Sequence, residues 1–120
     1  MEYLLLIYAD EKNDPGRSDN EEQNAEILNE YISFTQEARD AGVVLGLNPL
    51  QTTDAATTVR VRNGKTETTD GPFAETKEQL AGYYLVDCDN LDQALEWAAK
   101  VPGAKWGSIE VRPIWKLSGE

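Results

Sequence analysis

Two short runs decide the fold of this chain: YLLLIY at residues 3–8 and VVLGL at residues 43–47, with one long helical pattern between them. Each run is short, apolar and bounded by polar residues, which is typical of a strand inside a sheet. Between the two runs, apolar or weakly polar residues recur every three or four positions, as on one face of a helix; they are Ile27, Leu28, Tyr31, Ile32, Phe34, Thr35 and Ala38. Gly42 is a suitable residue to end that helix. The chain therefore begins with a predicted strand–helix–strand unit.

The second half repeats this order. Residues 81–87 form an apolar, aromatic run that predicts a strand, and Asn90 is placed to cap a helix over residues 91–101. Pro102 and Gly103 end that helix, and residues 108–114 alternate as a final strand. Two strand–helix units of this kind predict an α+β protein with a ferredoxin-like, split βαβ sheet and both helices on one face.

A hairpin is inserted between the two halves. Two runs rich in β-branched residues, 57–62 and 65–69, flank the dipeptide Asn63-Gly64. Both turn residues tolerate a positive φ, so this dipeptide is a strong short-range hairpin signal.

Two helices on one face leave the other face of the predicted sheet uncovered. Strands that are apolar on both sides need a second cover, and a symmetric partner would supply it. We therefore expect a homodimer that packs sheet to sheet.

Composition limits the classes of partner and compartment. The 120 residues carry a formal charge of −11, and residues 1–60 hold twelve acidic and four basic side chains. Such a field repels nucleic acid and anionic membranes, so neither is an expected partner. A lone cysteine, Cys88, forms no internal disulfide, and no apolar stretch has the length of a signal peptide or membrane span. We expect one cytoplasmic domain over residues 1–120.

The most unusual segment is TDGPFAETKE at residues 69–78. Gly71-Pro72 restricts the backbone, and a stiff loop that carries charged side chains can present them to a cleft. Asp70 is the candidate catalytic residue of that loop. The alternative is that Asp70 only hydrogen-bonds the backbone of its own turn. We predict that Phe73 anchors the loop in the core and also borders a binding site.

Two arginines and a tyrosine complete the candidate ligand-binding set. Arg60 and Arg112 lie within predicted strands, where an arginine must reach solvent, pair with a carboxylate such as Asp70 or Glu110, or bind an anionic ligand. Tyr83 and Tyr84 point to opposite faces of one strand, so one is expected in the core and the other in a pocket or dimer interface.

The segment at residues 69–78 resembles the motif of the DGPF group of YCII-related proteins. The resemblance extends to residues 57–60, 82–84 and 110–113, and so covers nearly the whole chain. It implies a dimeric α+β barrel with a pocket between sheet and loops, and a function that is largely undetermined. It also implies a link to sigma factors for some members. A His–Asp pair is the proposed centre in one branch, but this sequence has no histidine, so Asp70 alone matches.

Two functions stay open at this point. One is a small-molecule pocket near the Asp70 loop, with or without catalysis; the other is a non-catalytic dimeric module that contacts a regulatory protein. Without histidine, and with one cysteine, no metal site or cofactor is expected.

Overall fold

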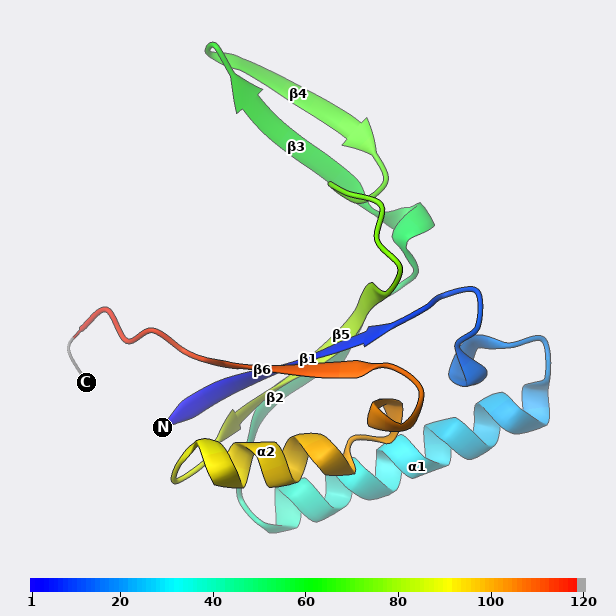
Figure 1. Cartoon of the computed structure of the whole chain (residues 1–120), viewed down its shortest axis with the longest axis vertical. Helices are drawn as coiled ribbons and strands as arrows, with labels where there is room; N and C mark the ends of the chain where they lie inside the picture. Colours follow the sequence, from blue (N-terminus) through cyan, green and yellow to red (C-terminus); the bar gives the residue numbers. More distant parts are fainter. Residues whose placement is uncertain (119–120) are drawn as a thin grey trace.

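The computed structural model describes residues 1–118, and they form six strands and two α-helices (Figure 1). In chain order these are β1 (Glu2–Ala9), α1 (Glu21–Asp40), β2 (Val44–Pro49), β3 (Thr57–Arg62), β4 (Lys65–Asp70), β5 (Gln79–Asp87), α2 (Leu91–Lys100) and β6 (Ser108–Pro113). Three short 3₁₀ turns, η1 (Pro15–Arg17), η2 (Thr53–Ala55) and η3 (Pro102–Lys105), lie in the connections.

Four strands form one antiparallel sheet in the order β2-β5-β1-β6. The strands β1 and β2, which flank α1, are separated by β5, and this is the split βαβ arrangement. The predicted α+β, ferredoxin-like fold is therefore confirmed.

Both helices cover the same face of this sheet, and the core lies between them. Leu5 at the centre of β1 is fully buried, with Val86 of β5 and Ala94 of α2 beside it in the core. Phe34 of α1 meets the rings of Tyr84 and Trp97 at 5.1 and 6.2 Å, in edge-to-face geometry. Asn20 and Asn90 cap the two helices, each accepting a hydrogen bond from a backbone amide of the first turn.

The opposite face of the sheet carries no helix. Its apolar centre is half-buried, and it is made of Leu4, Leu6, Tyr8, Tyr83 and Leu85. We call this set the open face. The strand β6 adds Glu110 and Arg112 beside it, since they pair with Leu6 and Leu4 in register.

The hairpin of β3 and β4 forms a separate two-stranded sheet that projects from the rest of the molecule (Figure 1). Its turn has positive φ at Asn63 (52°) and Gly64 (74°), so the predicted hairpin is confirmed. We call residues 57–70 the arm and the remainder of the described chain the body. Because of the arm, the radius of gyration is 16.3 Å, compared with about 13.6 Å for a compact domain of this length.

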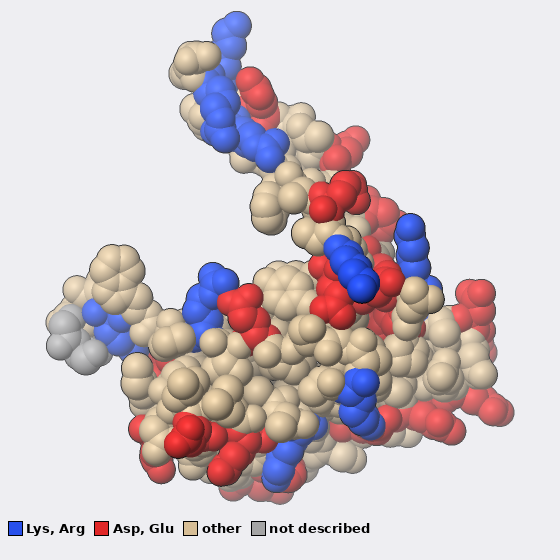
Figure 2. Space-filling model, in the orientation of Figure 1, with Lys and Arg blue, Asp and Glu red and all other residues tan. Residues whose placement is uncertain are grey.

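Charge divides between these two regions. Figure 2 shows Lys and Arg gathered along the outer part of the arm, whereas Asp and Glu predominate on the visible surface of the body. Residues 57–65 carry three basic side chains, Arg60, Arg62 and Lys65, and no acidic one.

Candidate functional site

A cavity of about 480 Å³ lies between α1 and the part of the sheet formed by the ends of β2 and β5. The helix contributes one continuous stripe of side chains, three or four residues apart, which are Asn24, Ile27, Leu28, Tyr31, Ile32, Thr35, Gln36 and Arg39. The sheet contributes mainly apolar groups, among them Ile7, Ala9, Leu47 and Ala81. The cavity is therefore an apolar groove with a few polar groups along one wall.

Two tyrosines bring hydroxyl groups to this groove. The Tyr84 hydroxyl lies 2.7 Å from the Thr35 hydroxyl, and the Tyr31 hydroxyl accepts a hydrogen bond of 3.1 Å from the Gly103 amide. Burial raises the pKa of Tyr31 to about 12, and burial also raises the pKa of Tyr84. Both phenols are thus protonated at neutral pH and can act there as hydrogen-bonding groups.

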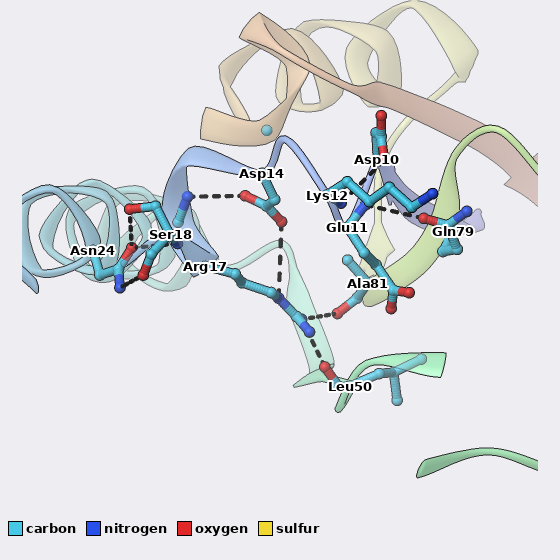
Figure 3. Close-up of polar contacts among 12 residues, drawn as sticks. Asp10, Glu11, Lys12, Asp14, Arg17, Ser18, Asn24, Leu50, Gln79 and Ala81 are labelled. Atoms are coloured by element: carbon cyan, nitrogen blue, oxygen red, sulfur yellow. Dashed lines mark hydrogen bonds and ion pairs between the residues drawn. The ribbon is translucent and has the colours of Figure 1, made fainter. Parts of the chain in front are cut away.

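Arg17 lines the groove at the end where β2 and β5 lead towards the arm. Its Nη2 donates to the carbonyl oxygens of Leu50 and Ala81, at 2.6 and 3.2 Å, and its Nε lies 3.8 Å from the Asp14 carboxylate (Figure 3). Leu50 follows β2 and Ala81 lies within β5, so this guanidinium ties together the two strands that lead into and out of the arm. Its donors are used mainly for structure.

Arg39 lies at the other end of the groove, in the last turn of α1. Its side chain is exposed, and no hydrogen bond or ion pair involves it within residues 1–118. This guanidinium is therefore available to an anion at the rim of the groove.

Among the predicted site residues, Tyr83 of β5 borders this cavity, but its side chain lies on the open face, on the other side of the sheet from the groove. Its hydroxyl accepts a hydrogen bond of 2.9 Å from the Asn48 side-chain amide on β2. Its neighbour Tyr84 is the buried one of the pair, so the predicted division of the two rings between opposite faces is confirmed.

The other predicted site residues lie outside this cavity. Arg60 and Phe73 come together at the root of the arm, where Arg60 Nη2 donates to the Phe73 carbonyl at 3.2 Å. Asp70 ends β4 opposite Thr57, and no hydrogen bond or ion pair reaches its carboxylate among the described residues. Arg112 pairs instead with Glu110, at 2.7 Å from Nε. The structure thus brings neither arginine to Asp70.

The prediction that Phe73 is anchored in the core is wrong. Its side chain is 76% exposed. The motif follows an arm that projects from the four-stranded sheet and packs against little else of the described chain, so its aromatic ring stays outside. A sequence pattern that identifies a stiff turn does not say which surface that turn meets.

Arg17, Tyr31 and Arg39 were not predicted as groove residues. The helical stripe of α1 was a signal for the groove. It continues through the polar Thr35 and is wider than the side of α1 that packs on the core. Leu28 and Ile32 belong to that stripe but remain exposed. An amphipathic stripe that is partly uncovered indicates a groove beside the helix.

Two kinds of feature are absent from the described residues. No group of three or more His, Cys, Asp or Glu side chains there is arranged to hold a metal ion. No helix within residues 1–118 is long and apolar enough to cross a membrane.

The fold and the groove define a small α+β protein of the ferredoxin-like class with a cavity beside its first helix. A family profile for the YCII-related domain matches residues 1–118, so the chain belongs to the YCII-related family. Members of this family have the dimeric α+β barrel fold. An uncharacterised protein of Rhizobium meliloti (strain 1021) is 40% identical over 116 residues, which cover 95% of this chain and 92% of that protein.

Proposed function

We propose that this protein binds a small molecule with an apolar body and an anionic end in the groove beside α1. The observation that carries the proposal is an apolar cavity of about 480 Å³ whose rim holds the guanidinium of Arg39, which forms no ion pair or side-chain hydrogen bond among residues 1–118. A volume of this size suits a small organic ligand. The hydroxyls of Thr35 and Tyr84 supply hydrogen-bonding groups within the groove.

Binding is better supported than catalysis. The ionisable groups that reach the interior of the groove are tyrosines whose pKa is raised, and a protonated phenol is a poor base at neutral pH. Asp14 and Arg17 at one end are already paired with each other and with the backbone. The proposal therefore names a ligand class and no reaction.

We also propose that the protein is a homodimer formed through the open face. The support is the apolar centre of that face, with Leu4, Leu6 and Leu85 on a side of the sheet that no helix covers. A second copy can cover these side chains symmetrically. A stable interface of this kind buries about 1,500 Å² or more in total.

A ligand-binding role for Asp70, with Arg60, Phe73 and Arg112, remains a separate proposal that concerns the arm root and the open face. Its support is the stiff turn at Gly71, where φ is +99°. The alternative function, a module that contacts a regulatory protein, is supported by the exposed arm and by no feature of the groove.

Binding in the groove is tested by calorimetry with straight-chain carboxylates of eight to twelve carbons and with the matching alcohols. We expect the best carboxylate to bind at least about tenfold more tightly than its alcohol, since that ratio corresponds to about 1.4 kcal/mol. Arg39→Gln should remove this preference, because the anion loses its partner at the rim.

A pair of variants checks where these probes bind. Ile32→Glu places a negative charge on an exposed rim residue, and we expect it to abolish carboxylate binding. Leu95→Glu is the matched control, since Leu95 is a comparably exposed helix residue outside the groove. Equal binding by both variants, or a failure of every probe to bind the unmodified protein, would contradict the proposal.

A further inference from the structure

The arm is a hairpin whose side chains are largely exposed to solvent. The strand β4 is exposed along its whole length, and Val59 and Val61 of β3 are each 59% exposed. No hydrogen bond joins the arm strands to the four-stranded sheet. An isolated two-stranded hairpin is marginally stable in water, so this arm needs something to pack against.

The two faces of the arm differ in chemistry. Residues that alternate along a strand share a face, and the register pairs Val59 with Thr68 and Val61 with Thr66. One face is therefore uncharged and β-branched along most of its length, with Asp70 only at the root; it consists of Thr57, Val59, Val61, Thr66 and Thr68. We call this set the uncharged face. Such residues are typical of strands that pack against another surface.

The opposite face is charged and partly covered. It carries Arg60, Arg62, Lys65 and Glu67, and the loop after β4 folds over its root. There the Thr58 hydroxyl donates to the Gly71 carbonyl at 2.8 Å, and Arg60 donates to Phe73. All five residues of the uncharged face, in contrast, are exposed. The fully exposed face of the arm is therefore the uncharged one, whereas a hairpin adapted to solvent would expose its charged face.

The arm also stands on the side of the sheet that a second copy would occupy. In Figure 1 the helices lie on one side of the four-stranded sheet, and β3 and β4 extend away from them on the other side. A molecule docked on the open face therefore lies beside the arm. Figure 2 shows the concave space between the arm and the body.

Charge favours a second copy over an unrelated partner. The chain carries a net charge of −11, whereas residues 57–65 hold three basic side chains and no acidic one. The whole arm, residues 57–70, holds three basic and two acidic side chains, a net charge of +1. Its outer, basic part is attracted by the acidic body of a second copy, although the basic side chains themselves lie on the face of the hairpin turned away from the contact.

We propose that the arm is an exchange element: in the dimer, each copy packs the uncharged face of its arm against the body of the other. This inference rests on the proposed homodimer and adds the segment that holds it together. It also assigns a role to Asp70, which lies on the same side of the hairpin as the uncharged face and would therefore face the partner. Phe73 follows at the root of the arm, beside Arg60 of the charged face.

The test is cross-linking in a mixture of unlabelled and nitrogen-15-labelled protein. A benzophenone is attached at residue 61 of a Val61→Cys variant, in a Cys88→Ala background that removes the native thiol. Mass spectrometry then separates cross-links within one chain from those between two chains. The control carries the same group through Glu67→Cys, at a similar height on the charged face.

We expect at least about fivefold more mixed-isotope product from residue 61 than from residue 67, with the cross-linked peptide in the body. Sedimentation of the same samples reports the oligomeric state. A dimer with equal yields from both faces, with cross-links confined to one chain, or with none from residue 61 would overturn the arm exchange and leave the homodimer standing. A monomer throughout the micromolar range would overturn both.

Discussion

The body buries the apolar side chains of its strands, whereas the arm exposes them to solvent. In the body, Leu5 of β1 is 0% exposed and belongs to a core cluster that includes residues of both helices, whereas Val59 and Val61 in the arm keep more than half of their surface in solvent. Both regions have regular backbone hydrogen bonding and good strand-forming residues. The difference lies in packing alone. Secondary structure can therefore be complete in a region whose tertiary partner is missing from the chain.

Because of this difference, mutations in the body and in the arm are expected to have different effects. Replacing a body residue should lower the stability of a single copy, since its contacts are within the chain. Replacing an arm residue should change the dimer and leave a single copy nearly unaffected.

The largest expected effect is that of Leu5→Ala. Removing this fully buried side chain should lower the free energy of unfolding by about 3 kcal/mol, through lost apolar contact and the cavity left behind. Val59→Ala, measured in urea at a concentration where the protein is monomeric, should change it by less than about 0.5 kcal/mol. Comparable losses from the two changes would mean that the arm packs within its own chain.

The next effect concerns Tyr31 at high pH. Its pKa is raised from about 10 to about 12 in the folded protein, so the unfolded chain loses this proton first. The associated stability is present below pH 10 and is lost as the pH rises towards 12. Tyr31→Phe should therefore lose less stability than the unmodified protein between pH 9 and pH 11 in urea titrations.

At neutral pH the same variant leaves the Gly103 amide without its acceptor, which should cost about 1 kcal/mol. A steeper loss of stability with pH in the Tyr31→Phe variant than in the unmodified protein would contradict the assignment.

A smaller effect is expected for Phe73→Ala. Because the ring is 76% exposed, the free energy of unfolding of the monomer should change by less than about 0.5 kcal/mol. The dimer dissociation constant, measured by sedimentation, should rise instead, since the exposed ring lies at the root of an arm that packs against the partner. A loss of about 3 kcal/mol in the monomer would restore the original expectation of a buried anchor.

A small stability effect is also expected for Asp70→Asn. No described residue pairs with its carboxylate, so removing the charge should shift monomer stability by less than about 1 kcal/mol. A functional Asp70 should show itself as lost ligand binding or altered dimerisation. A destabilisation near 3 kcal/mol would instead indicate a structural partner for this carboxylate.

Most of the body could be predicted from the sequence. The apolar run at residues 3–8 and the stripe on residues 27–38 each express local periodicity, and Asn63-Gly64 specifies its turn directly. The groove could be predicted less well, because it depends on how wide a gap the helix leaves beside β2. The position of Phe73 could not be predicted, because no local rule says whether an aromatic ring meets its own chain or another.

The most direct measurement of the central claim, that the arm gains its packing from a second copy, is hydrogen–deuterium exchange at several protein concentrations. The amides of β1 and β5 should be protected at every concentration, because their packing is within the chain. Protection of the hydrogen-bonded amides in β3 and β4 should rise as the protein dimerises, and should fall again on dilution. Arm protection that stays constant through the monomer–dimer transition would contradict the account.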